Sequence, residues 1–356
     1  MKTNRNIIIY SVNTDIWRVD MSKELFMNAL SSSRGEYAPA CGSATSIVTM
    51  DLMDKTGVSF PEAHLDAEKM ALLSGAGCSE LGFDNVMPLF GVWHESAALG
   101  CRVDWGEKHR MPDCQHHLCE NMNDEMKITS DFLMHESCQT PLKAIKILKK
   151  RFGRDAAITG KVFGPWTLGY HVYGVENFLV ASLLEPDKVK EAMRKLIEVT
   201  VAFATAQIDA GADTICLGDH CTRDLCSPDT YRDFLKEIHQ ELAERIKCPL
   251  ILHICGDSSD RIRYIAETGV ACFHFDSKVP TETARLLAGG KLALMGGTSN
   301  YAVIRKGSPE TIAADVREKI ENKINIIGPE CAVPLDAPMK NLKLLASETK
   351  KYRQGK

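Results

Sequence analysis

Residues 214–256 read TICLGDHCTRDLCSPDTYRDFLKEIHQELAERIKCPLILHICG and contain a complete strand–helix–strand unit. The apolar runs at its two ends, Thr214–Leu217 and Leu250–Ile254, have the continuous pattern of strands buried in a parallel sheet. Between them, Ser227 before Pro228 is a typical helix start, an N-cap residue ahead of a first-turn proline. Apolar residues then recur at helical spacing, at Tyr231, Phe234, Leu235, Ile238, Leu242 and Ile246.

The same alternation runs along the chain from Arg34 onward. Eight strands are expected, each followed by a helical segment: Tyr37–Cys41, Asp84–Met87, Ala157–Val162, Thr214–Leu217, Leu250–Ile254, Cys272–Asp276, Leu292–Met295 and Ile324–Ile327. Eight such units predict an α/β fold of the (β/α)8 TIM barrel type. A doubly wound open sheet is the alternative, but neither a G-x-G-x-x-G nor a Walker-type loop follows any of these strands.

We expect a single barrel domain over residues 1–356, because no Pro/Gly/Ser-rich linker divides the chain. Residues 1–33 would form an N-terminal extension of one strand and one helix, and residues 34–356 the barrel. The stretch Gly100–Thr140 is long and weakly periodic. It is interpreted as an insertion after the second strand that forms a lid or hairpin above the barrel mouth.

The composition is that of an average globular protein, with 44% hydrophobic and 25% charged residues. The net charge of −4, without a long block of one sign, argues against nucleic-acid or membrane-surface binding. No apolar run approaches the ~20 residues of a membrane span, and no signal peptide is evident. The thirteen cysteines are scattered and odd in number, which favours buried thiols and metal ligands over a disulfide framework. We expect a cytosolic protein.

In a barrel of this kind, reactive residues lie at the C-terminal ends of the strands. Four of the expected strands end in polar or sulfur-bearing residues that would surround one cavity: Gly218–Cys221, His253–Gly256, His274–Asp276 and Gly328–Cys331. His253 and Cys255 are two residues apart on one strand, so their side chains point the same way. Cys331 follows the eighth strand, whose end faces the same interior.

One imidazole and two thiolates select zinc over magnesium or calcium. Three protein ligands leave a fourth position for substrate, as in catalytic rather than structural zinc sites. The alternative is that His253, Cys255 and Cys331 are ordinary buried core residues. Their placement at strand ends, together with the neighbouring Gly256, favours the metal site.

These residues also carry a resemblance to a known family. It covers roughly Met21 to the C-terminus and rests on Leu250–Gly256, Gly328–Pro334, Leu52–Val58 with Pro61–His64, and Ser227–Thr230. The sequence resembles the corrinoid-dependent zinc methyltransferases of the methylcobamide:coenzyme M methyltransferase type. These belong to the uroporphyrinogen decarboxylase/methionine synthase barrel superfamily. The H-x-C…C pattern is typical of the methyltransferase branch and not of the decarboxylases.

The resemblance implies that His253, Cys255 and Cys331 bind zinc. It also implies a fourth, carboxylate ligand in the absence of thiol at Asp276, where close relatives have Glu. A zinc-bound thiolate would then attack the methyl group of a methylated corrinoid, leaving Co(I). The chain has no D-x-H-x-x-G corrinoid motif, so a separate corrinoid protein is expected to bring the methylcobalamin to the barrel mouth. The acceptor is open between coenzyme M, another thiol and a folate.

Other residues with functional potential lie close to these. Asp219 and His220 end the fourth strand and are candidate substrate contacts, with an ordinary buried acid as the alternative for Asp219. A run of potential metal ligands in the insertion, Cys114, His116, His117 and Cys119, is a weaker candidate for a second zinc site because no fixed scaffold is evident around it.

Three rival functions remain at this point. A uroporphyrinogen decarboxylase would carry an arginine-rich N-terminal segment, whereas Tyr37–Met53 contains no arginine. A cobalamin-independent methionine synthase has a duplicated barrel about twice this length. A non-catalytic zinc- or corrinoid-binding homologue is disfavoured by the intact His253, Cys255 and Cys331.

Overall fold

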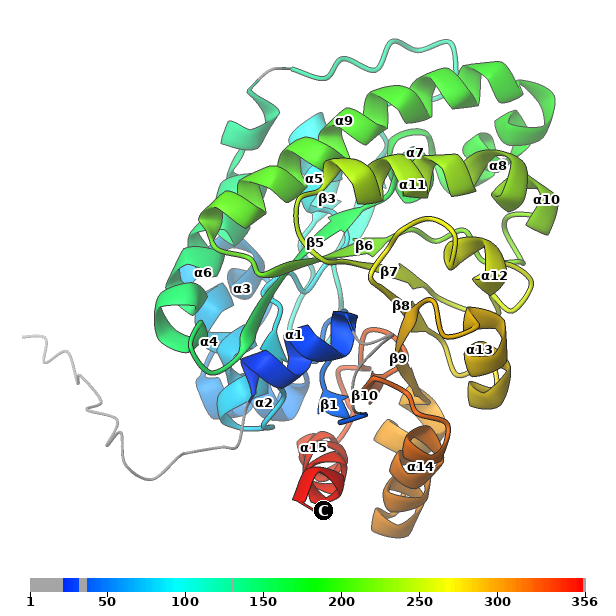
Figure 1. Ribbon diagram of the computed structural model, residues 1–356. Helices are drawn as coiled ribbons and strands as arrows, with labels where there is room; N and C mark the ends of the chain where they lie inside the picture. The colour runs from blue at the N-terminus through cyan, green and yellow to red at the C-terminus, as the bar shows by residue number, and fades with distance from the viewer. Residues whose placement is uncertain (1–21, 32–36, 130, 355–356) are drawn as a thin grey trace, which may run out of the picture.

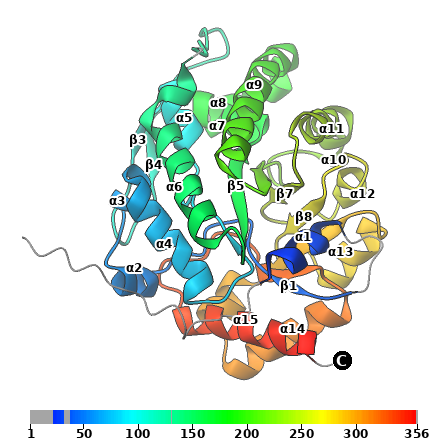
Figure 2. The ribbon, with the colours of Figure 1, turned by 60° about the vertical axis from the view of Figure 1, so that its left-hand side comes forward.

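The computed structural model describes residues 22–31, 37–129 and 131–354. Eight strands form one parallel sheet in the order β1-β10-β9-β8-β7-β6-β5-β2, with helices around it (Figures 1 and 2). The strands are β1 Ala40–Cys41, β2 Asn85–Val86, β5 Ala157–Phe163, β6 Thr214–Gly218, β7 Leu250–Ile254, β8 Cys272–Phe275, β9 Ala293–Thr298 and β10 Ile326–Pro329. The two end strands are joined where the Asp84 N–H donates to the Cys41 carbonyl at 2.8 Å. The expected (β/α)8 barrel is confirmed.

The unit between β6 and β7 shows how the sequence builds the barrel. The Ser227 hydroxyl caps the Thr230 N–H at 3.0 Å, and Pro228 begins the helical segment. That segment runs through α10 (Pro228–Thr230), a π-helical turn η2 (Tyr231–Leu235) and α11 (Lys236–Arg245). Ile246 follows the helix in extended conformation but is still buried, so the whole predicted apolar stripe except Phe234 is buried.

The remaining helices cover the outside of the barrel, its ends and its insertion. They are α1 Lys23–Ser31, α2 Met50–Thr56, α3 Glu62–Leu65, α4 Ala67–Ser79, α5 His94–Leu99, η1 Phe132–Met134, α6 Glu136–Phe152, α7 Pro165–Tyr173, α8 Val175–Leu184, α9 Pro186–Ala210, α12 Ile262–Ile265, α13 Thr281–Ala288, η3 Asn300–Arg305, α14 Pro309–Glu321 and α15 Met339–Gln354. None of the described helices is both long and apolar enough to cross a membrane.

Helix α1 closes the end of the barrel at which the strands begin (dark blue in Figure 2). Phe26 and Leu30 of this helix pack in one buried cluster with the first residues of several strands, among them Ala40, Ala157 and Ile326. The expected helix of the N-terminal extension is therefore present. The strand expected before it lies outside the described residues, and the division at residue 33 stays a prediction.

The insertion after β2 contains the expected hairpin. Strands β3 (Arg102–Asp104) and β4 (Asp113–His116) pair antiparallel. The predicted C-terminal limit at Thr140 was wrong, because α6 already begins at Glu136. Its first turns are polar and Pro141 lies inside the helix, which hid the helical periodicity in this segment.

Several strand limits also differ from those predicted. Strand β9 extends to Thr298 instead of ending at Met295, and β10 is displaced by two residues toward Pro329. Gly296 and Gly297 carry β9 onward without an apolar signal, so the periodicity could not show its end. The shift matters for the site, because it brings the end of β10 to within two residues of Cys331.

Candidate metal centre and its cavity

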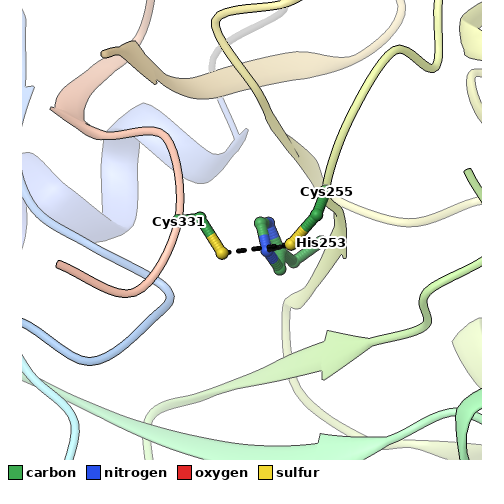
Figure 3. Close-up of side chains that lie close together, drawn as sticks. All are labelled: His253, Cys255 and Cys331. Atoms are coloured by element: carbon green, nitrogen blue, oxygen red, sulfur yellow. Dashed lines mark hydrogen bonds between the residues drawn. The ribbon is translucent and has the colours of Figure 1, made fainter. Parts of the chain in front are cut away.

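Three predicted ligands converge at the C-terminal ends of β7 and β10 (Figure 3). The Nε2 atom of His253 lies 3.0 Å from the Cys255 sulfur, and that sulfur lies 3.0 Å from the sulfur of Cys331. The three potential ligand atoms all lie within 4.8 Å of one another. Both cysteines are free thiols, half-buried, while His253 is buried. The expectation that the two strand ends face one another is confirmed.

Backbone contacts fix the orientation of the His253 ring. Its Nδ1 lies 3.2 Å from the carbonyl oxygen of His274, to which an Nδ1–H can donate. The Nε2 lone pair is then left facing the two sulfurs, which is the arrangement of a metal-binding histidine. The His274 ring is held in turn, because its Nε2 lies 2.8 Å from the carbonyl of Pro329 at the end of β10. The strands β7, β8 and β10 are thus linked directly behind the cluster.

The two thiols differ in acidity because they share a hydrogen bond. Donation from Cys255 holds the pKa of Cys331 well below its ordinary value. The pKa of Cys255 is raised, first by the hydrogen bond to Cys331 and then by burial. Two sulfur atoms beside an oriented imidazole form a donor set that fits a soft divalent metal such as zinc.

Asp276 lies outside this cluster and binds backbone amides. Its Oδ2 accepts from the Gly256 N–H at 2.8 Å and its Oδ1 from the Lys278 N–H at 2.9 Å. Gly256 has φ +78° and follows Cys255 directly, so the carboxylate holds the turn that ends β7. A Cβ at this glycine would also approach the Thr222 hydroxyl to 2.6 Å. The role of Asp276 as a fourth metal ligand stays a prediction.

Asp219 lines the same cavity as the cluster and is fully engaged in a buried network. Its Oδ1 accepts from the backbone N–H and the hydroxyl of Thr167, at 2.8 and 3.0 Å, and its Oδ2 lies 3.1 Å from Nε2 of His239. The carboxylate sits so close to Gly164 that a Cβ there would lie 2.3 Å from it. Asp219 therefore joins β6 to the first turn of α7. Its role as a substrate contact remains untested.

A cavity of about 180 Å³ opens in front of the metal-ligand cluster. Its wall includes the cluster itself together with Asp219 and His220, the latter exposed to solvent. Sequence reasoning missed other lining residues, among them Lys161, Phe163, Thr167 and His171. Only Lys161 had a visible signal, as a charged residue within the otherwise uncharged strand Ala157–Phe163.

The polar residues of the insertion do not form a second metal cluster. Cys114 lies 3.7 Å from Nδ1 of His117, but that nitrogen is also 2.8 Å from the carbonyl of His171. His116 is exposed, whereas Cys119 is buried. Within the ranges that the structure describes, the group of His, Cys and carboxylate side chains close enough to hold a metal is the one at the barrel mouth.

Glu95 on α5 is a buried acid near this cavity, and its ionisation should make the stability of the protein depend on pH. It is 0% exposed, its Oε1 accepts from the Phe163 N–H at 2.9 Å, and burial raises its pKa to about 7. Because the folded-state pKa lies above the unfolded one, its stabilising contribution is complete only below about pH 4.5 and is lost as the pH rises through 7. The free energy of unfolding of Glu95→Gln, relative to that of the wild type, should therefore rise by up to about 3 kcal/mol between pH 5 and pH 8. Urea unfolding at both pH values measures this; parallel profiles would contradict it.

Comparison with known proteins identifies the family. Residues 21–352 match the model of the uroporphyrinogen decarboxylase (URO-D) family. The chain belongs to the URO-D family. Within it, the methylated-thiol–coenzyme M methyltransferase of Methanosarcina mazei is 32% identical, over 88% of this chain and 85% of that protein. The methylcobamide:CoM methyltransferase MtaA of Methanosarcina barkeri is 28% identical, over 93% of this chain and 98% of that one.

Comparison with a solved structure also relates this URO-D chain to a methyltransferase. A methyltransferase from Methanosarcina mazei superposes with a TM-score of 0.89 at 28% identity, covering 93% of this chain and 98% of that structure. The expected resemblance is confirmed, and the chain is an enzyme of the methyltransferase branch of the family.

Proposed function

We propose that this methyltransferase moves the methyl group of a methylated corrinoid onto a small thiol, coenzyme M being the model acceptor. The observation that carries the proposal is the convergence of His253 Nε2 with the sulfurs of Cys255 and Cys331 beside a cavity. The names of the relatives, which include methylcobamide and coenzyme M, agree with it.

In this proposal His253, Cys255 and Cys331 hold zinc. Bound zinc supplies the Lewis acidity that keeps an acceptor thiol deprotonated near neutral pH. The chain's own residues orient the site: the His274 carbonyl sets the His253 tautomer, and Asp276 fixes the turn after Cys255. The acceptor sulfur forms a bond to the methyl carbon, while the cobalt–carbon bond breaks with its electron pair left on cobalt.

The size of the cavity favours a small acceptor. At about 180 Å³ it is close to the ~150 Å³ of an apolar cavity that holds one benzene molecule. A corrin or porphyrin ring is far larger and would stay at the mouth. The methyl donor is therefore best delivered by a separate corrinoid protein, which docks where the strands end. A decarboxylase acting on a tetrapyrrole is correspondingly disfavoured.

A cytosolic location belongs to the same proposal. All thirteen cysteines, which lie within the described ranges, are free thiols. Such a set of unpaired thiols is expected in a reducing compartment.

The decisive assay uses methylcobalamin as donor. The full chain is loaded with zinc and incubated with methylcobalamin and, in turn, coenzyme M, other thiols and tetrahydrofolate. Formation of cob(I)alamin with a thiol supports the proposal. Formation with tetrahydrofolate alone would make the acceptor a folate and not a thiol. Absence of cob(I)alamin with every acceptor would contradict the proposed transfer from a methylated corrinoid.

Binding of the thiol acceptor should release about one proton. A thiol that arrives protonated at pH 7 must lose its proton to bind a metal. Calorimetry in buffers that differ in ionisation enthalpy measures this release, with the alkylated thiol as the control that cannot release a proton. A heat of binding independent of the buffer would contradict the proposed thiolate.

A further inference from the structure

Lys161 is a buried cation whose charge the protein does not neutralise by contact. The side chain lies on β5, is 4% exposed, and lines the cavity beside the metal-ligand cluster. Its backbone N–H and carbonyl bond to Gln207 at 2.9 and 2.8 Å. The ammonium, in contrast, lies over the Phe163 ring at 5.0 Å and has no hydrogen-bonded or ion-paired partner in the described parts of the chain.

The other buried lysine of the described residues shows what is unusual here. Lys319 is equally buried, but its ammonium binds the carboxylates of Asp315, at 3.1 Å, and Glu318. A buried charge without such a partner carries a large desolvation cost. Lys161 therefore lacks what Lys319 has, namely an anion at its ammonium.

The register of the barrel brings the Lys161 ammonium to the cavity floor. Phe163 pairs with Gly218, which pairs with His253, so these three residues share one level of the barrel. Lys161 lies two residues earlier on β5 and pairs with Cys216, one level deeper, by roughly 6–7 Å. A lysine stem is long enough to cross this distance, and the contact with the Phe163 ring shows that it does.

Two buried carboxylates lie near the cavity, and neither contacts the Lys161 ammonium. Asp219 accepts from Thr167 and lies against His239. Glu95 accepts from the Phe163 N–H through Oε1, its buried Oε2 has no hydrogen-bond partner in the described residues, and neither oxygen forms an ion pair with Lys161. Because no described carboxylate contacts the ammonium, the cavity leaves the place of a contacting anion to a ligand.

We infer that Lys161 binds an anionic group at the far end of the acceptor, and so selects small thiols that carry a sulfonate or a carboxylate. The inference rests on the proposed function, because it assumes that the acceptor sulfur lies at the cluster of His253, Cys255 and Cys331. The cavity then has two ends, a sulfur-binding end at the cluster and an anion-binding end at Lys161.

The test compares matched thiols on matched variants. The ligands are 2-mercaptoethanesulfonate, 3-mercaptopropionate and the uncharged 2-mercaptoethanol. The variants of the full chain are Lys161→Met, which keeps a long stem without charge, Lys161→Arg, which keeps the charge, and Lys278→Met. Lys278 is exposed on the loop after β8, so its replacement removes one charge at the same end of the barrel. Zinc content is measured for every variant.

For Lys161→Met, the KM for the anionic thiols should rise roughly tenfold to hundredfold, the loss expected for one hydrogen bond to a charged group. With the uncharged mercaptoethanol, the KM should change about twofold or less, and the zinc content should be unchanged. Lys161→Arg should recover most of the preference, and Lys278→Met should match the wild type. Equal losses for charged and uncharged thiols, or loss of zinc, would overturn the inference and make Lys161 a counter-charge for the thiolates.

A thiol-free ligand separates this inference from the proposed function. Ethanesulfonate binding, followed by NMR titration, needs neither the metal nor methyl transfer. Binding to the wild type that Lys161→Met abolishes supports the anion site, even if the methylcobalamin assay fails and removes the proposed function. Failure of ethanesulfonate to bind the wild type, or equal binding to both proteins, overturns the anion site even if methyl transfer is observed.

Discussion

Cys255→Ser is expected to lose zinc and methyl transfer together while the barrel stays folded. The Cys255 sulfur lies between His253 Nε2 and the Cys331 sulfur, 3.0 Å from each, so its removal takes the central donor from the set. A serine hydroxyl is a poor ligand for a soft metal. Because bound zinc supplies several kcal/mol of catalysis, activity should fall roughly a thousandfold or more. His253→Ala should behave in the same way.

Retention of the fold is expected because the cluster lies at the strand ends, above the packed interior of the barrel. Circular dichroism and metal analysis on the purified protein measure the two parts of the prediction. Cys248→Ser is the matched control: this half-buried free thiol precedes β7, at the opposite end of the same strand. It should keep both zinc and activity. Full zinc occupancy in Cys255→Ser would remove the assignment of the site.

Asp276→Ala should keep about one zinc per chain but change thiol affinity and rate by roughly tenfold or more. In the proposed site His253, Cys255 and Cys331 hold the metal without Asp276, whereas loss of the carboxylate frees the Gly256 N–H and loosens the turn after Cys255. Losses of 10–100-fold are typical when a residue that orients a metal ligand is replaced. Steady-state kinetics with methylcobalamin and a thiol, alongside zinc analysis, provide the measurement.

Asp276→Asn distinguishes the two roles of this carboxylate. An asparagine oxygen can still accept from the Gly256 N–H, but it is a weaker metal ligand than a carboxylate. Kinetics close to the wild type in Asp276→Asn would assign the residue to holding the turn. Loss equal to that of Asp276→Ala would favour direct ligation, and an oxygen at about 2.0–2.2 Å from zinc in a metal-bound, thiol-free structure would establish it.

The sequence determined the fold because each strand–helix unit of the barrel leaves its pattern within a short stretch of the chain. A strand buried on both faces is an apolar run, and a helix packed on a sheet shows its stripe within a dozen residues, as from Ser227 to Ile246. Strand ends were less certain where the pattern stops being apolar, as at Gly296 and Gly297. The start of α6 was missed because a polar first turn and Pro141 carry no stripe.

His253 and Cys255 could be predicted to lie together for the same reason, since residues two apart on one strand share a face. Their partnership with Cys331 depended on closure of the barrel, which the sequence implied only through the number of its units. The contacts of the neighbouring acidic residues could not be predicted from the sequence. Asp219 and Asp276 have similar positions after their strands, yet one joins β6 to α7 and the other holds a turn.

The sequence by itself determined a (β/α)8 barrel of the URO-D family with a His-x-Cys…Cys pattern of candidate metal ligands at the strand ends. The tertiary structure alone decided which polar groups are satisfied and which are not. Whether a lysine on a buried strand meets a carboxylate depends on the register of neighbouring strands and on what closes over it. Lys319 is paired locally, with Asp315 four residues earlier on helix α14. Lys161, in contrast, lines the cavity without a contacting anion because of the strands arranged around it, and no local pattern records that.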